Sequence, residues 1–211
     1  MLDYLLVLLA GLVMGGILLW WATRVRRRGV VIWFTGVPAS GKSTIAAEVE
    51  RRLSWDYPVK NLDADGVREN LTPDLGYEPE DRDENTRRLA WMAKTLAEQG
   101  VIAIVTCVSP LRSQRQRAKQ MAEEAGCRFI GVYVDCPLEV CQERDPKGLY
   151  ARAEAGEIDY IAGLHLPYEK PKVWSQPSSW DLWLNSDMMT VRECADSVIE
   201  LLDDVGIAAP V

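Results

Sequence analysis

The residues whose types and spacing indicate chemistry begin at Gly36. Gly36, Gly41, Lys42 and Ser43 satisfy the pattern GxxxxGK[ST], between an apolar run that ends at Gly36 and an amphipathic stretch that begins at Lys42. In such a loop, backbone N–H groups and the start of the following helix face the phosphates of a nucleotide. The lysine neutralises the β- and γ-phosphates, and the serine hydroxyl ligates Mg²⁺. The sequence therefore predicts a Mg²⁺-nucleotide site, without deciding between a kinase, a GTPase and a motor.

Two carboxylates follow at the end of a second predicted strand, 58–65. They are Asp63 and Asp65, and Arg68 adds an anion-binding group three residues further on. The carboxyl end of a neighbouring strand opens onto the same crevice as the phosphate loop. Alternate residues of a strand share a face, so we expect both carboxylates to reach Mg²⁺ or an acceptor hydroxyl. The alternative is an ordinary Asp-Gly turn.

Further cations gather near the predicted strand ends. They are Arg82, Arg87, Arg88, Arg112, Arg115, Arg144 and Lys147. A run of charge is usually a solvated helix face, which we expect for Arg117 and Lys119. In an acidic domain, cations grouped near strand ends indicate a site for two anionic substrates, such as ATP and a small phosphorylated acceptor.

Short apolar runs alternate with amphipathic stretches from Gly29 onward, which indicates an α/β fold with a mostly parallel, five-stranded sheet. The expected strands are 30–36, 58–65, 101–108, 129–136 and 179–186. The expected helices are 42–53, 84–100, 112–126, 137–144 and 190–206. The segment 145–178 is long and rich in charge, Gly and Pro, so we interpret it as a lid.

Composition and charge limit the class of protein. The chain has 211 residues, of which 48% are hydrophobic and 26% charged, as in a globular domain with an appendage. The total charge is −7 and the first 28 residues carry +3, which leaves −10 for the remainder and argues against a nucleic-acid polymer as partner. The five cysteines fit no zinc pattern, and we expect buried free thiols.

The uncharged run YLLVLLAGLVMGGILLWWAT occupies residues 4–23. As a helix it is about 30 Å long, and it ends in two tryptophans that four arginines follow closely. A cleaved signal peptide would carry its positive charge before the run. The sequence therefore predicts a single-pass membrane anchor with its basic flank in 1–28, and a cytoplasmic domain in 29–211. Gly11 and Gly15 form a GxxxG pair, which is compatible with a homodimer or with docking to another membrane protein.

From about residue 30 to 204 the chain resembles the adenylylsulfate kinase family. The stretches that carry the resemblance are GVPASGKST, LDADGVR, LGYEPEDRDENTRR, SPLRSQR, VDCPLEVCQERDPKGLYARAEAGEI and PYEKP, in this order. DPKGLY, in the predicted lid, is highly specific. The resemblance implies a P-loop NTPase three-layer fold and the phosphorylation, by ATP with Mg²⁺, of the 3′-hydroxyl of adenosine 5′-phosphosulfate (APS).

The resemblance also implies roles for individual residues. ATP binding falls to Gly36, Ser40, Gly41, Lys42, Ser43, Thr44 and Arg144. Catalysis falls to Lys42, Asp63 and Asp65, with Mg²⁺ held by Ser43 and Asp65. Acceptor binding falls to Arg68, Tyr77, Arg82, Asn85, Ser109, Pro110, Arg112, Lys147 and Ile161.

The departures from the family pattern all fall on the acceptor side. Tyr77 stands where the family has a Phe that stacks on adenine, and Ile161 occupies the place of a second stacking Phe. An aliphatic side chain does not stack as an aromatic one does, so we expect a weaker clamp on the base. His165 replaces an acid, and we assign it no chemistry.

Three functions stay open from the sequence. The first is a membrane-anchored APS kinase, which the DPKGLY and DRDEN runs favour. The second is a kinase of another activated nucleotide, such as a cytidine diphosphate derivative for surface polysaccharides, which the altered acceptor side favours. The third is a nucleotide-binding subunit of a membrane assembly with little turnover. The retention of Asp65, Arg68 and Lys147 disfavours the third, because a mere binder needs no acceptor site.

Overall fold

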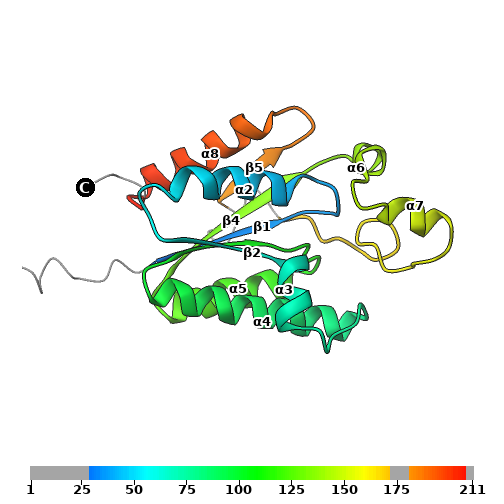
Figure 1. Ribbon diagram of the computed structural model, residues 1–211, viewed down its shortest axis with the longest axis horizontal. Helices are drawn as coiled ribbons and strands as arrows, with labels where there is room; N and C mark the ends of the chain where they lie inside the picture. Colours follow the sequence, from blue (N-terminus) through cyan, green and yellow to red (C-terminus); the bar gives the residue numbers. More distant parts are fainter. Residues whose placement is uncertain (1–28, 172–180, 208–211) are drawn as a thin grey trace, which may run out of the picture.

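The computed structural model describes residues 29–171 and 181–207, which form a parallel sheet covered by helices (Figure 1). The strands are β1 (Val30–Thr35), β2 (Val59–Asp63), β3 (Ile102–Thr106), β4 (Arg128–Asp135) and β5 (Leu182–Asn185). The helices are α2 (Lys42–Leu53), α3 (Ala64–Leu71), α4 (Pro79–Glu98), α5 (Arg112–Glu124), α6 (Leu138–Arg144), α7 (Leu149–Glu154) and α8 (Val191–Asp204). The sheet order is β2-β3-β1-β4-β5, and every neighbouring pair is parallel.

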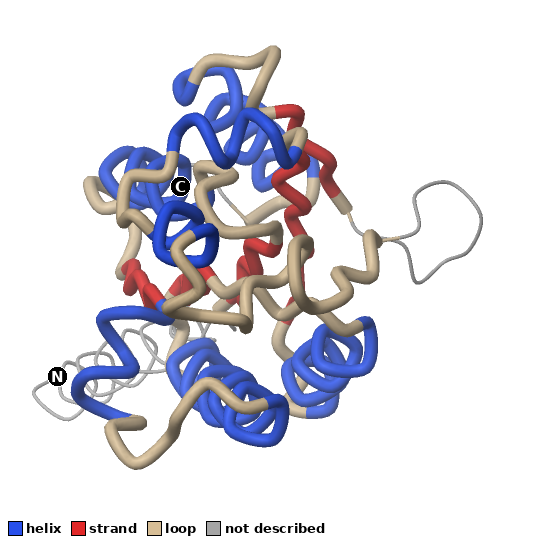
Figure 2. Tube along the Cα trace, turned by 90° about the vertical axis from the view of Figure 1, so that its right-hand side faces the viewer, coloured by secondary structure: helices blue, strands red, loops and turns tan. Residues whose placement is uncertain are grey.

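The central strand β1 shows why this sequence makes three layers. All six of its residues are buried. Val30, Ile32 and Phe34 pack in one apolar cluster with α2 and α8, whereas Val31 and Trp33 pack in another with α4 and α5. Alternate side chains of a strand point to opposite faces, so an apolar strand requires helices on both. Figure 2 shows helices on both sides of the row of strands, which confirms the predicted three-layer α/β fold.

The carboxyl ends of the parallel strands meet at one edge of the sheet. The register aligns Phe34 with Thr106 across β1 and β3, and Thr106 with Asp63 across β3 and β2. On the other side, Thr35 aligns with Tyr133 of β4. In Figure 1 this is the side that carries α6 and α7. Ligands of open parallel sheets bind at this edge, so the fold places the phosphate loop and the predicted carboxylates together.

The main differences from the sequence prediction are two element boundaries and two short helices. The strand expected over 58–65 ends at Asp63, because the Asp63 side chain accepts a hydrogen bond from the N–H of Asp65 and starts α3. Helix α4 begins at Pro79 rather than at residue 84, since proline fits the first helical turn. The short helices α3 and α7 were not predicted.

The predicted lid is folded around a small core of its own. The core residues are Cys136, Cys141, Tyr150, Ile158 and Ile161, packed against Val37 and Ala39 of the phosphate loop. Tyr150 also donates a hydrogen bond to the carbonyl oxygen of Pro38 at 3.1 Å. The described part of this segment, 145–171, is therefore attached directly to the phosphate loop. Residues 172–178 of the predicted lid lie outside the described residues.

Two further predictions concern the cysteines and the membrane. All five cysteines are free and buried, as predicted. The predicted span 4–23 lies outside the described residues. In the described part of the chain, no helix combines the length and the apolar character that crossing a membrane requires.

Candidate functional site

The phosphate loop is shaped by its two glycines. Gly41 has a φ of 95°, in the left-handed region, and forms the N-terminal boundary of α2. A Cβ at Gly36 would lie 2.5 Å from the carbonyl oxygen of Val134. Any other residue would strain the backbone at position 41, and at position 36 it would collide with β4. The glycines therefore let the loop curl tightly between β1 and α2.

Lys42 lies inside this loop. Its Nζ donates hydrogen bonds to the carbonyl oxygen of Val37 at 2.7 Å and to Ser40 Oγ at 3.2 Å. Burial lowers the pKa of Lys42 to about 8, although nearby thiols and carboxylates, including Asp65 and Asp63, favour its charged form. The loop thus holds an ammonium group whose protonation changes close to neutral pH.

Asp63 joins the phosphate loop to two neighbouring strands. Its Oδ2 accepts hydrogen bonds from Ser43 Oγ at 2.6 Å and from Thr106 Oγ1 at 2.9 Å, and its Oδ1 accepts from the Asp65 N–H at 3.0 Å. Burial raises the pKa of Asp63, but these three hydrogen bonds outweigh it, so the net shift is downward. Asp63 is therefore ionised at neutral pH, beside the serine expected to ligate Mg²⁺.

Asp65 reaches the site from a helix, not from a strand. The prediction that Asp63 and Asp65 share one face of a strand is wrong, because Asp63 caps α3 and Asp65 lies in its first turn. The carboxylate of Asp65 forms an ion pair with Lys147 of the predicted lid. The hydrogen bond to Asp65 raises the pKa of Lys147, so the ammonium is charged at neutral pH. Both residues line a cavity.

This cavity has a volume of about 520 Å³. Eight of the nine predicted acceptor residues line it, and they are Arg68, Tyr77, Arg82, Asn85, Ser109, Pro110, Lys147 and Ile161. Asp65 lines it as well, together with Arg152 and Tyr160, which were not predicted. The cations of the lining outnumber the carboxylates. A cavity of this size and charge fits a small anionic nucleotide.

Arg112, the ninth predicted acceptor residue, does not line this cavity. Its guanidinium lies 3.5 Å from the carbonyl oxygen of Lys170, and its backbone N–H donates to Glu169 Oε2 at 2.7 Å. Arg112 is the first residue of α5, and these contacts are with residues near the end of the described part of the predicted lid.

Two stacked tyrosines belong to the lining of the cavity. The rings of Tyr77 and Tyr160 are stacked, with centroids 4.6 Å apart and planes 7° from parallel. The Arg68 guanidinium lies 4.5 Å from the centroid of Tyr77. Ile161, the predicted stacking position, is 3% exposed and packs into the lid core, although it borders the cavity. Tyr160, one residue earlier, is therefore the ring that faces Tyr77.

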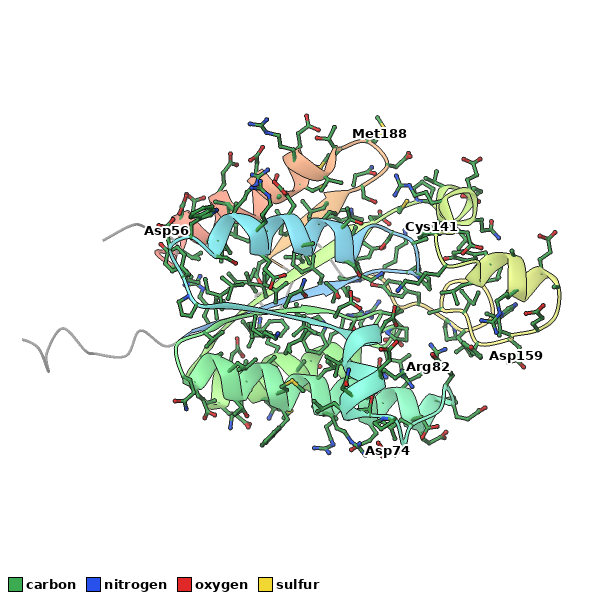
Figure 3. All side chains as sticks on the ribbon, viewed as in Figure 1. Asp56, Asp74, Arg82, Cys141, Asp159 and Met188 are labelled. Carbon is green, nitrogen blue, oxygen red and sulfur yellow. The ribbon has the colours of Figure 1, made fainter. Side chains whose placement is uncertain are left out.

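Arg82 holds the two tyrosines together. Its guanidinium donates to the carbonyl oxygen of Tyr77 and to that of Tyr160, both at 2.6 Å. Figure 3 labels Arg82, which lies between the α3 side of the cavity and the segment that carries α7. Burial lowers the pKa of Arg82, and the charge of Arg68 lowers it further. Arg82 thus connects the acceptor wall with the lid.

Arg144 is linked to the phosphate loop through Ser186. It donates to the carbonyl oxygen of Ser186 at 2.8 Å, and Ser186 Oγ donates to the carbonyl oxygen of Ser40 at 2.7 Å. Thr44 is exposed in the first turn of α2. The structure therefore brings the predicted ATP residues together and adds Ser186, which carries no motif that the sequence alone reveals.

No group of three or more His, Cys, Asp or Glu residues is arranged to hold a metal ion within 29–171 and 181–207. Mg²⁺ differs from zinc or calcium in this respect, because it is usually bound by one or two carboxylates and the phosphates of a substrate. The hydroxyl of Ser43 and the carboxylates of Asp63 and Asp65 fit that requirement.

Comparisons with known proteins agree with one another. The family described as adenylylsulphate kinase matches residues 28–175. An adenylyl-sulfate kinase from Halothermothrix orenii is 48% identical over 181 residues, which cover 85% of this chain and 92% of the relative. One from Saccharomyces cerevisiae is 43% identical over 178 residues, 84% of this chain and 85% of the relative. The APS kinase CysC of Mycobacterium tuberculosis, solved with AMPPNP and APS, is 42% identical and superimposes with a TM-score of 0.76 over 83% of this chain and 98% of that chain.

Proposed function

Because the chain belongs to the adenylylsulphate kinase family, we propose that it transfers the γ-phosphoryl group of ATP to the 3′-hydroxyl of adenosine 5′-phosphosulfate. The observation that carries this proposal is the cavity beside the phosphate loop. Its lining brings Asp65 and Lys147 together with the aromatic pair Tyr77 and Tyr160. The carboxylate and the ammonium suit a hydroxyl that accepts a phosphoryl group, and the rings suit a base, which are the two parts of a nucleoside acceptor.

The donor nucleotide binds at the phosphate loop. Its residues are Gly36, Ser40, Gly41, Lys42, Ser43 and Thr44, with Arg144 beside them. The charged Lys42 neutralises the β- and γ-phosphates, and the first turn of α2 adds backbone N–H groups. Ser43 and Asp65 would hold Mg²⁺, with Asp63 accepting the hydrogen bond of the Ser43 hydroxyl. When bound, Mg²⁺ supplies positive charge to the β- and γ-phosphates.

Asp65 accepts the proton of the attacking hydroxyl. It stands in the first turn of α3, next to the phosphate loop, where the acceptor and the γ-phosphate meet. Lys147, now paired with Asp65, adds positive charge beside the transferring group. Arg68, Arg82 and Asn85 bind the acceptor from the cavity wall. The reaction needs little covalent chemistry from the protein, so its rate depends on positioning and charge neutralisation.

The acceptor base binds between Tyr77 and Tyr160. A base that contacts both rings needs about 7 Å between them, twice the carbon contact of about 3.5 Å. The two centroids are 4.6 Å apart, so the rings must separate when the acceptor binds. Tyr160 belongs to the lid segment and Tyr77 precedes α4, so movement of the lid segment accommodates the base.

A panel of acceptors tests the proposal. The full chain is supplied with ATP, Mg²⁺ and either APS, an adenosine nucleotide without sulfate, or a cytidine diphosphate derivative, and kcat/KM is compared. We expect the highest kcat/KM with APS. A preference for the cytidine nucleotide would instead support a kinase of another activated nucleotide. ATP binding without turnover on any acceptor would support a binding subunit.

We also propose that residues 4–23 anchor the domain to a membrane and leave it in the cytoplasm. The support is the uncharged run and the arginines that follow it. The full chain should stay in the membrane fraction after an alkaline wash, while a variant that lacks residues 1–28 should be released. Release of the full chain by the wash would contradict the anchor.

A further inference from the structure

A buried hydrogen-bond network connects the end of β1 with Ser109 and Pro110. These two residues line the acceptor cavity and are called the acceptor wall below. Thr35 Oγ1 donates to the carbonyl oxygen of Val108 at 2.7 Å and accepts from Ser109 Oγ at 3.1 Å. Ser109 Oγ in turn accepts from Trp33 Nε1 at 3.1 Å. The Tyr168 hydroxyl lies 2.9 Å from Thr35 Oγ1 and is the donor, because the Thr35 proton is directed to Val108.

Arg115 extends this network to Glu169, near the end of the described part of the predicted lid. Its side chain is among the most buried of the described residues, at 2% exposed. It donates to the carbonyl oxygens of Ser109 at 2.6 Å and Pro110 at 3.0 Å, and to that of Glu169. Its guanidinium also lies 5.6 Å from the centroid of the Tyr168 ring. One buried cation therefore connects the acceptor loop with residues 168 and 169.

Ser109 itself has an unusual backbone. Its φ is 36°, and φ is rarely positive for residues other than glycine. Such a conformation persists only where the surroundings hold it firmly. The bonds from Trp33 and Arg115 supply that restraint, and Ser109 forms part of the cavity wall.

The network touches both substrate sites through the backbone. Thr35 directly precedes Gly36 of the phosphate loop, whereas Ser109 and Pro110 line the acceptor cavity. Arg115 and Tyr168 do not line the acceptor cavity. Transfer requires the reacting atoms to lie about 3–3.5 Å apart, and a misplacement of about 1 Å lowers the rate on the order of 10²-fold.

We propose that Arg115 and Tyr168 are positioning residues, which set the separation between the phosphate loop and the acceptor wall without touching either substrate. This inference rests on the proposed kinase function. The sequence context of Arg115 suggested an anion-binding group. In the structure Arg115 instead supports Ser109 and Pro110 of the acceptor cavity through their carbonyl oxygens.

Kinetics of the full chain test the proposal with Tyr168→Phe and Arg115→Met. Arg117→Met is the matched control, because Arg117 lies on the same helix but pairs with Asp83 at 2.8 Å. Turnover is expressed per folded site, counted by ATP binding. We expect kcat to fall about tenfold in Tyr168→Phe and about 10²-fold in Arg115→Met, while the Kd of ATP changes less than about twofold. Arg117→Met should keep the wild-type kcat.

Two results would overturn it. A wild-type kcat in folded Tyr168→Phe would show that the network does not contribute to catalysis. If Arg115→Met does not fold, the result for Tyr168→Phe decides. An equal loss of kcat in Arg117→Met would mean that any damage to α5 has the same effect.

The network has a second readout that does not depend on the identity of the acceptor. In ¹⁵N-labelled full chain, the indole N–H resonance of Trp33, assigned with Trp33→Phe, should move in Tyr168→Phe and stay in Arg117→Met. A resonance that does not move in Tyr168→Phe rejects the network even if the wild type phosphorylates a different nucleotide. If the resonance moves in Tyr168→Phe but the wild type does not phosphorylate APS, the network stands and only the proposed function is contradicted.

Discussion

Lys42 combines burial with a catalytic charge, and this gives it a testable pH dependence. Burial lowers its pKa to about 8, so the free enzyme loses the ammonium charge as the pH rises through that value. The charged form binds the phosphates of ATP. We therefore expect kcat/KM for ATP to be constant below about pH 8 and to fall about tenfold per pH unit above it, because this parameter reports the free enzyme. Initial rates between pH 6.5 and 9.5 measure it.

The control for this prediction is Lys42→Arg. A guanidinium keeps its charge throughout this range, so the remaining activity of the variant should lack the alkaline decline. If both proteins decline alike, another group causes the pH dependence. If the wild type shows no decline, Lys42 does not titrate near pH 8.

The stacked pair Tyr77 and Tyr160 should contribute to the binding of the acceptor base. Stacking of one base contributes about 1–3 kcal/mol, so Tyr77→Ala and Tyr160→Ala should each raise the KM of APS about five- to a hundred-fold, at tenfold per 1.4 kcal/mol. The KM of ATP should hardly change. Ile161→Val is the matched control, because it shortens a lid-core side chain next to the pair. Equal effects of Tyr160→Ala and Ile161→Val would place the clamp at residue 161 after all.

Helix α3 is the element that carries the acceptor side of the chemistry. Its cap, Asp63, also accepts hydrogen bonds from Ser43 and Thr106. Asp65 and Arg68 are three residues apart on this helix and share a face, and both line the cavity. The start of α3 therefore sets the distance between the phosphate loop and the acceptor.

Two substitutions at Asp63 separate the cap from the charge. In Asp63→Asn, the amide oxygen can still accept the hydrogen bond from the Asp65 N–H. The amide nitrogen can donate to the hydroxyl oxygens of Ser43 and Thr106, because a hydroxyl can also accept a hydrogen bond. Asp63→Asn should therefore retain most of the unfolding free energy. Asp63→Ala removes the cap and should cost about 0.5–2 kcal/mol of unfolding free energy. Both should lower kcat, since both lose the carboxylate beside Ser43. Thermal unfolding and kcat measure the two effects, and a full kcat in Asp63→Asn would show that the charge is dispensable.

The sequence predicts much of this architecture because its strongest signals are local. The phosphate loop lies between an apolar strand and an amphipathic helix, and the structure confirms these elements. Helix α3 escaped prediction because Asp63 starts it with a side-chain hydrogen bond inside what reads as one strand. Tyr160 and Arg115 escaped because their contacts, with Tyr77 and Glu169, are far away in the sequence. Residue types alone did not show which of several arginines is buried.

The whole molecule carries its described site at the carboxyl end of the sheet. Gly29 precedes the start of β1 and the phosphate loop follows its end, so a six-residue strand of about 20 Å separates Gly29 from the loop. Every motif predicted from the sequence lies within 36–171. We therefore expect the 29–211 fragment to phosphorylate APS with the kcat of the full chain. A folded fragment that is inactive, beside an active full chain, would show that residues 1–28 contribute to the site.

The position of the transferred phosphoryl group decides whether the chain phosphorylates APS at its 3′-hydroxyl. The full chain is incubated with ATP labelled in the γ-phosphate, Mg²⁺ and APS, with Lys42→Ala as the inactive control, and the product is examined by mass spectrometry and ³¹P NMR. We expect one labelled phosphate on the 3′-hydroxyl, an intact sulfate, and one ADP for each product molecule. Release of labelled inorganic phosphate without a labelled acceptor, or label at another position of APS, would contradict it.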